Sequence, residues 1–153
     1  MASEFKKEGS IGYLVHEVAR LLRRRFEEEA RIHGVTLPQW RALAEISRNE
    51  GIAQVALAGC IDTDPMTMSG ILDRLEKRGL IERYTDPNDS RAKLARMTAN
   101  GEALVATARN VGRGLYEHSL EGLSPAEREQ ITAGLLRIRD NLSRMNAEQK
   151  EAV

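Results

Sequence analysis

Four cationic side chains lie close together in the middle of the chain, on two short segments that the sequence predicts to form a β-hairpin. Arg83 lies on the first segment, whereas Arg91, Lys93 and Arg96 lie on the second. Cations on a projecting hairpin can make charge-assisted hydrogen bonds with phosphate, and an arginine at the tip can enter a narrow DNA minor groove. Asp89 is close enough in sequence to hold the Arg91 guanidinium in position. The alternative is a solvated hairpin whose ion pairs contribute little.

A short amphipathic segment precedes the hairpin and offers small polar side chains at its amino-terminal end. We expect a helix that is capped by Asp64, has proline at its first position and ends at Gly79. Thr67 and Ser69 can hydrogen-bond base edges or phosphates, and Met66 offers an apolar group to a thymine methyl. The face expected to be buried carries Met68, Ile71, Leu72 and Leu75. The alternative is that this helix serves only packing.

These residues need a scaffold, and the preceding sequence predicts one. A short helix is expected over residues 54–60, and a tight turn over residues 62–64 joins it to the helix described above. Two helices joined in this way form a helix-turn-helix, whose second helix enters the DNA major groove with its amino-terminal residues first. A further helix begins at Thr36, which forms a capping box with Gln39. The middle of the chain is therefore predicted to be one compact unit.

Long helices flank this unit on both sides. Apolar residues recur at helical spacing over residues 11–32, over residues 98–120 and from Pro125 onward. In the last of these helices they alternate by four and three, as in a coiled-coil seam. Since the small middle unit cannot cover these faces, we expect the helices to pack on one another and on a second copy related by two-fold symmetry. The tail after Asn146 is polar and is expected to fray.

Composition excludes several classes of protein. The 153 residues have 41% hydrophobic and 4% aromatic content and a formal net charge of zero, so positive charge for a polyanion must be concentrated locally. Cys60 is the one cysteine, which excludes an intramolecular disulfide and indicates a reducing cytoplasm. No stretch is apolar enough to span a membrane, and no signal sequence is evident. The sequence shows no nucleophile–base set, phosphate loop, cofactor motif or metal-ligand spacing, so an enzyme is not expected.

Five short motifs between residues 35 and 101 can be compared with a known family. They are VTLPQW from Val35, AQ from Ala53, DRLEKRGLI from Asp73, DPNDSRAK from Asp86 and MTANG from Met97. Together they resemble the winged helix-turn-helix of the MarR family of bacterial transcription regulators. The flanking helices occupy the positions of that family's dimerisation region.

The resemblance implies a homodimer that binds a palindromic operator in double-stranded DNA. It implies that Asp89 and Arg91 form the acid–arginine pair of the wing, with Arg91 in the minor groove. The other residues that we expect at or near the DNA are Gln54, Met66, Thr67, Ser69, Arg74 and Lys93. Ser69-Gly70 replaces the family's frequent Thr-Arg, and Ala53 replaces a common threonine, which suggests weaker binding or a different operator.

The resemblance also implies a small aromatic or phenolic effector, bound between the dimerisation helices and the winged unit. The candidate lining residues are Tyr13, His16, Arg20, Trp40 and Tyr116. Trp40 has a strong alternative, which is that its ring packs in the core. Some relatives sense oxidants through a cysteine near the start of the first long helix, where this chain has none.

We therefore expect an α+β fold that is mostly α: a winged helix-turn-helix with long N- and C-terminal dimerisation helices. Residues 1–35 and 98–153 would form the dimerisation region, and residues 36–97 the DNA-binding unit. The expected function is that of a cytoplasmic, sequence-specific transcriptional repressor that a small effector releases from its operator. The alternatives are a dimeric interaction module with weak or lost DNA binding, which the zero net charge, Ala53 and Gly70 favour, and an oxidant sensor acting through Cys60.

Overall fold

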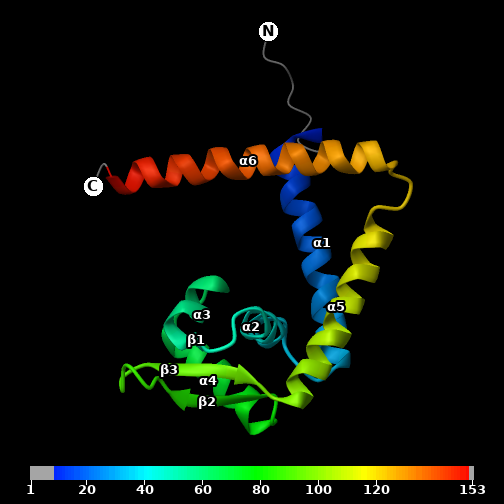
Figure 1. Cartoon of the computed structure of the whole chain (residues 1–153). Coiled ribbons are helices and arrows are strands. Elements are labelled where there is room, and N and C mark those ends of the chain that lie inside the picture. The colour runs from blue at the N-terminus through cyan, green and yellow to red at the C-terminus, as the bar shows by residue number, and fades with distance from the viewer. Residues whose placement is uncertain (1–8, 152–153) are drawn as a thin grey trace. The chain divides into compact units, whose positions relative to one another are not determined.

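The computed structural model of the chain describes residues 9–151, which form six α-helices and three β-strands (Figure 1). The elements are α1 (Ile11–Ile32), α2 (Leu37–Arg48), β1 (Ile52–Ala53), α3 (Gln54–Cys60), α4 (Pro65–Lys77), β2 (Ile81–Thr85), β3 (Lys93–Met97), α5 (Ala99–Ser119) and α6 (Pro125–Glu151). The predicted fold class, α+β and mostly α, is confirmed. The predicted helix over residues 11–32 and the short helix over residues 54–60 are formed at the predicted bounds.

Local capping determines where the helices begin. The Thr36 hydroxyl accepts the backbone N–H of Gln39, whose side-chain oxygen accepts the N–H of Thr36, as a capping box requires. At α6 the hydroxyl of Ser124 accepts from the N–H of Glu127, whose carboxylate accepts from the N–H of Ser124. The hydrogen bond from the Ser124 backbone is the largest cause of the lowered pKa of Glu127. Because these signals lie within four residues of sequence, they could be read directly from it.

The sheet has the order β1-β3-β2, and both pairings are antiparallel. In the hairpin Ile81 pairs with Met97 and Thr85 pairs with Lys93. Strand β1 is not predicted from the sequence, because its two residues are too few to show an alternating pattern. Its Ile52 pairs with Ala95, so β1 covers the free edge of β3.

The core lies between the helix-turn-helix and the sheet. Its fully buried large side chains are Leu43, Ile46, Leu57, Met68, Leu72, Leu75, Ile81 and Val105. The four residues that we expected on the inner face of α4 are all buried. Gly101 marks the closest approach, because a Cβ at this position would lie 2.0 Å from the carbonyl oxygen of Leu80. A side chain at Gly101 would therefore force the first turn of α5 away from the start of β2.

The chain divides into two compact units, residues 1–113 and 114–153, and the boundary falls within α5. The second unit contains the end of α5 and all of α6. Arg128 stabilises the turn between them, since its guanidinium donates to the carbonyl oxygens of Leu120 and Leu123 and to the Glu117 carboxylate. The dimerisation region proposed from sequence remains a prediction, because it concerns contacts with a second chain.

The described part of α6 differs from the prediction in one respect. The helix continues to Glu151, whereas we expected the chain to fray after Asn146. The added residues are alanine, glutamate, glutamine and lysine, which have high helix propensity, so the prediction of fraying from their polarity was wrong. On the outer surface of this helix, the large apolar side chains that remain exposed are Ile131, Leu135, Leu136, Ile138, Leu142 and Met145.

Candidate nucleic-acid interface

The helix-turn-helix is formed by α3, a tight turn and α4. Asp62 has a φ of 54°, the left-handed conformation that aspartate tolerates better than most residues, and this lets the chain reverse between the helices. The N–H of Thr63 donates to the carbonyl oxygen of Ala58 at 3.0 Å and closes the turn. At the start of α3, Ala53 provides no side-chain cap, and the predicted site residue Gln54 is half-buried.

Helix α4 presents a distinct outer face opposite its buried stripe. Met66, Gly70 and Arg74 follow one another at intervals of four residues, so they lie on successive turns of this face. Met66 is 85% exposed, and Arg74 is exposed with no acidic partner in the described part of the chain. Ser69 is half-buried beside them. Of the side chains predicted to contact DNA from α4, Met66, Thr67 and Arg74 are therefore exposed, and Ser69 is not.

Thr67 differs from this pattern because its hydroxyl is already engaged. Its Oγ1 donates to Oδ2 of Asp64 at 2.5 Å, and its backbone N–H donates to Oδ1 of the same carboxylate at 2.9 Å. The Thr67 hydroxyl is the largest cause of the lowered pKa of Asp64, which therefore remains ionised at neutral pH. Thr67 can still accept a hydrogen bond, but its hydroxyl proton is used inside the helix cap.

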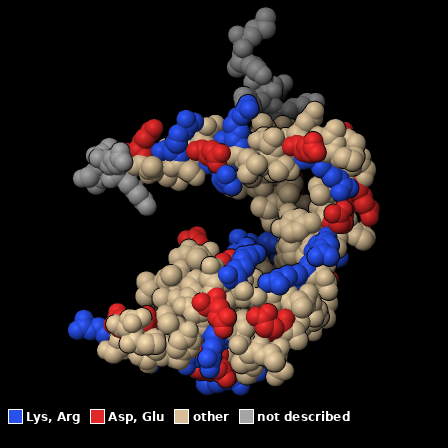
Figure 2. Space-filling view, viewed as in Figure 1, with Lys and Arg blue, Asp and Glu red and all other residues tan. Residues whose placement is uncertain are grey.

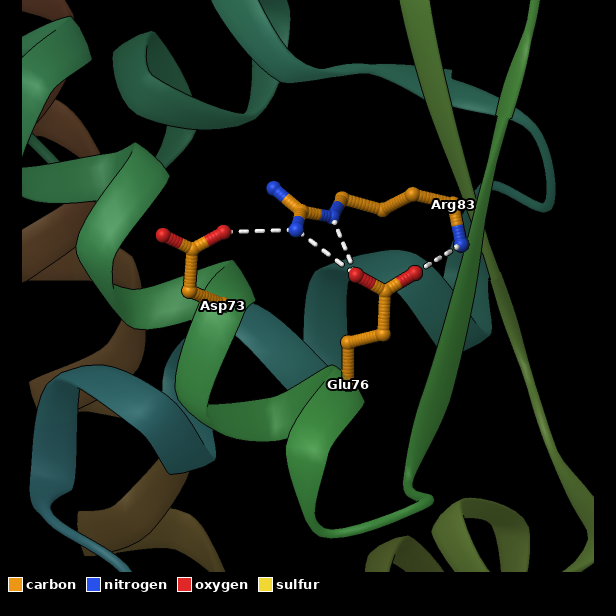
Figure 3. A network of polar contacts seen from close by, with 3 residues as sticks. All are labelled: Asp73, Glu76 and Arg83. Carbon is orange, nitrogen blue, oxygen red and sulfur yellow. Dashed lines mark hydrogen bonds and ion pairs between the residues drawn. The ribbon is translucent and has the colours of Figure 1, made fainter.

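Arg83 of β2 is bound to α4 by a network of four hydrogen bonds (Figure 3). Its Nε and Nη2 donate to Oε2 of Glu76 at 3.0 and 2.6 Å, and Nη2 also donates to Asp73 at 2.5 Å. The backbone N–H of Arg83 donates to the other oxygen of Glu76 at 3.0 Å. The guanidinium lowers the pKa of Glu76, and the Glu76 carboxylate raises the pKa of Arg83. This network connects the hairpin to the helix beside it.

Arg96 is also paired within the hairpin. Its Nε and Nη2 lie 2.9 and 2.7 Å from the carboxylate of Glu82, which faces it across the strands, and this carboxylate raises the pKa of Arg96. The guanidinium also lies over the Tyr84 ring, 5.4 Å from its centroid. Two of the four cations that the sequence places on the hairpin are therefore already paired within the fold. Arg83 and Arg96 are neutralised by acids that sequence reading did not assign to them.

The tip of the hairpin is different. The Asp89 carboxylate accepts the backbone N–H of Arg91 at 2.9 Å, and Asp86 accepts that of Asn88 at 2.8 Å. The expectation that Asp89 holds the Arg91 guanidinium is corrected, because the carboxylate instead orders the backbone of the turn, as aspartates in turns commonly do. The Arg91 side chain is exposed without an acidic partner among residues 9–151, and Lys93 donates only to the hydroxyl of Thr85, at 2.9 Å. Figure 2 shows this cationic tip in blue at the end of the hairpin.

The five candidate effector residues are not brought together within one chain. Trp40 is 7% exposed and packs edge-on against His33, with ring centroids 5.8 Å apart, at the carboxyl-terminal end of α1. Tyr13 lies near the other end of α1, about 30 Å along the helix at 1.5 Å per residue. Tyr13, His16 and Arg20 are exposed and share one face of α1, and Tyr116 is exposed in the second unit. Trp40 is a core residue of the first unit.

The described residues were also predicted to lack a metal site and a membrane span, and one cysteine was considered as an oxidant sensor. Cys60 is exposed at the end of α3. Between residues 9 and 151, no three His, Cys, Asp or Glu side chains are grouped to hold a metal ion. The helices described there are all too short or too polar to cross a membrane.

The fold and this surface define the winged helix-turn-helix class. The sequence model of the MarR family matches residues 35–93. The transcriptional regulator HosA of Escherichia coli O111:H- is 37% identical over 95 residues, which span 62% of this chain and 70% of HosA. The HTH-type transcriptional repressor Rv2887 of Mycobacterium tuberculosis is 30% identical over 80% of this chain and 88% of its own length. The crystal structure of apo MarR from E. coli superimposes with a TM-score of 0.76 at 26% identity, covering 84% of this chain and 96% of MarR.

The chain therefore belongs to the MarR family. It is a transcriptional regulator and not an enzyme.

Proposed function

We propose that the chain binds a palindromic operator as a homodimer in the cytoplasm and represses transcription there. In each protomer α4 lies in a major groove and the tip of the β2–β3 hairpin lies in the adjacent minor groove. Residues 36–97 contact the DNA, and residues 1–35 and 98–153 form the dimer, of which residues 1–8 and 152–153 lie outside the described part. The two half-sites are about one helical turn apart, roughly 34–36 Å.

The cationic tip of the hairpin is the observation that carries this proposal. Arg91 and Lys93 have no acidic partner in the described chain, whereas Arg83 and Arg96 are paired with acids. An unpaired guanidinium on an ordered turn is suited to a narrow minor groove, where the negative potential is enhanced. The zero net charge of the chain does not oppose this, because the positive charge is local.

The apolar side chains left exposed on two helices support the dimer. Those on α6 follow the spacing of a coiled-coil seam, and the exposed aliphatic side chains in the first half of α1 are Ile11, Leu14, Val15, Val18 and Leu21. Monomeric proteins rarely expose large contiguous apolar surfaces. Association with a second copy of the chain would bury these side chains. Light scattering of the purified chain should give twice its 17.1 kDa mass.

Selection of bound fragments from the source genome tests DNA binding and gives the operator. Fluorescence anisotropy with that operator should then show an affinity that falls steeply as the salt concentration rises. The slope of log affinity against log salt should be about one unit for each phosphate that the protein neutralises. Absence of binding at low salt would refute the proposal and favour a dimeric interaction module. An insertion of about half a helical turn between the half-sites should also abolish tight binding, because the two α4 helices would face different sides of the duplex.

We further propose that a small aromatic acid releases the dimer from DNA. Tyr13, His16 and Arg20 share an exposed face of α1 and offer a ring, an imidazole and a guanidinium to such a ligand. Nη2 of Arg20 also donates to Oε1 of Glu17 at 3.3 Å on the same helix, so a carboxylate would compete with Glu17. A panel of aromatic carboxylates and phenols is tested for a rise in melting temperature and for release of labelled operator. Arg20→Ala should weaken the response to carboxylates more than the response to neutral phenols. An equal loss for both would remove Arg20 from the site.

A further inference from the structure

The first turn of α4 presents an apolar surface where hydrogen-bonding groups would be expected. Helix α4 has five large apolar side chains, of which Met68, Ile71, Leu72 and Leu75 are buried. The fifth, Met66, is 85% exposed, the largest exposed fraction among the exposed large hydrophobic side chains of the described chain. Since the amino-terminal residues of a recognition helix enter the major groove first, Met66 is placed where bases are read.

The neighbouring polar groups are less available for reading bases. The hydroxyl proton of Thr67 and its backbone N–H are both donated to Asp64. The Asp64 carboxylate accepts both of these bonds and stays ionised, so it repels phosphate oxygens. The side chain of Ser69 is half-buried. Apolar contact is therefore the readout that this turn can best provide.

Gly70 lies one turn further along the same outer face, between Met66 and Arg74. A Cβ built at Gly70 would meet nothing within 4 Å, and its φ is not in the left-handed region, so the fold accepts alanine here. In a helix alanine is more stabilising than glycine. Because Gly70 has no side chain, the backbone of α4 is uncovered at this point of its outer surface. Another surface can therefore approach the helix closely here.

We propose that Met66 reads the 5-methyl group of a thymine in each half-site, and that Gly70 lets α4 lie close enough to the groove for this contact. The 5-methyl group is the apolar feature that distinguishes thymine in the major groove. Burial of one methyl group changes the affinity by about fourfold, so two half-sites together give about 15-fold. This inference rests on the proposed binding of DNA and specifies which base feature α4 selects.

Deoxyuridine tests the contact directly because it removes the methyl group and leaves the hydrogen-bonding edge unchanged. Each thymine of the selected operator is replaced by deoxyuridine, symmetrically in both half-sites, and affinity is measured by anisotropy. Replacement at one of these thymine positions should lower the operator affinity of the wild-type protein about 15-fold. Met66→Ala should bind the thymine duplex about as weakly as wild type binds that deoxyuridine duplex, and it should lose nothing further from the replacement. Val55→Ala, which also truncates an exposed apolar side chain, should keep the full methyl dependence.

Gly70→Ala provides an independent readout with opposite signs. It should raise the melting temperature while weakening operator binding about tenfold or more, since the added methyl group has space in the free protein but not against the bases. Gly114→Ala changes another glycine at which a Cβ meets nothing within 4 Å, far from α4 in sequence; if light scattering shows that its dimer is intact, it should not reproduce this loss of operator affinity.

The outcomes separate this inference from the proposed function. Tight, salt-dependent binding that no deoxyuridine replacement weakens, or an equal methyl dependence in Met66→Ala, would overturn the methyl readout and leave DNA binding intact. If the operator affinity of Gly70→Ala were unchanged, the proposed close approach of α4 to the groove at Gly70 would be refuted. A dimer that binds no DNA at low salt would refute both proposals.

Discussion

The base and the tip of the β2–β3 hairpin carry the same kinds of side chain and use them differently. At the base, Arg83 and Arg96 are bound to carboxylates of α4 and of the neighbouring strand. At the tip, Arg91 and Lys93 have no acidic partner in the described chain, and the nearby acids bind backbone N–H groups instead. The difference shows that the fold itself neutralises the cations at the base and leaves those at the tip available to a polyanion.

The comparison also assigns the two regions different tasks. The base fixes the angle between the hairpin and α4, because Arg83 connects the two elements through Glu76 and Asp73. The tip, on the proposed function, provides charge to DNA. Three quantities measured together distinguish orientation from contact: operator affinity, the salt dependence of that affinity and the free energy of unfolding.

Arg91→Ala should have the largest effect on operator binding. Two minor-groove arginines per dimer should together be worth about a hundredfold in affinity, and the slope of log affinity against log salt should fall by about 2. The free energy of unfolding should change by less than about 0.5 kcal/mol, because the side chain is exposed. Anisotropy across a salt series and urea unfolding measure these quantities.

Arg96→Ala is the matched control on the same hairpin. Because Glu82 already neutralises Arg96, the affinity should change by about twofold or less. Equal losses for the two variants would break the distinction between base and tip.

Arg83→Ala should weaken operator binding by about tenfold without changing the salt slope. The variant loses the connection to α4 and leaves Glu76 and Asp73 unpaired near the DNA, while no phosphate contact is removed. Unfolding should become easier by about 1 kcal/mol, since this ion pair is only partly buried. A slope reduced as far as in Arg91→Ala would show that Arg83 contacts phosphate.

Asp89→Ala should have a smaller effect, about fivefold in affinity, because it loosens the turn that presents Arg91. Asp89→Asn should retain most of the affinity, since its side-chain oxygen can still accept the Arg91 N–H. If Asp89→Asn were as weak as Asp89→Ala, the negative charge of Asp89, and not its hydrogen bond, would matter.

Acidification should weaken the ion pair at the base of the hairpin. The Arg83 guanidinium lowers the pKa of Glu76 below its ordinary value of 4.5 in the folded state. Because the folded pKa is the lower one, this pair stabilises the protein above about pH 4.5, and the stabilisation is lost as the pH falls through the folded pKa. Urea unfolding of wild type and Glu76→Gln should therefore differ by less than about 1 kcal/mol at pH 7, and the difference should disappear as the pH falls through the folded pKa of Glu76, which lies below 4.5. A difference that does not change with pH would contradict this role.

Most of the helices could be predicted from the sequence because the signals that start them are local. Thr36 with Gln39 and Ser124 with Glu127 are capping pairs three residues apart, and the helix starts that they indicate are formed. Strand β1 was missed because two residues cannot show a period, and its identity depends on a pairing with β3 far along the chain.

The candidate interface was less predictable for a related reason. Arg83 and Arg91 look equivalent in the sequence, and only the folded arrangement brings Arg83 against Glu76 and Asp73. The role of Asp89 was misassigned because a carboxylate two residues from an arginine can accept either its side chain or its backbone N–H. Sequence reading identified the residues in both cases but not their partners.

The pairing of β1 with β3 has a consequence for how the protein is made. Ile52 pairs with Ala95, and the loop closed by this pairing contains α3, α4 and β2. During synthesis β3 therefore leaves the ribosome after both helices of the helix-turn-helix and after β1 and β2. Contacts between residues distant in sequence form late because closing the intervening loop costs entropy. The nascent chain can form α2, α3 and α4 early, but a complete wing becomes available only after residue 97 has emerged.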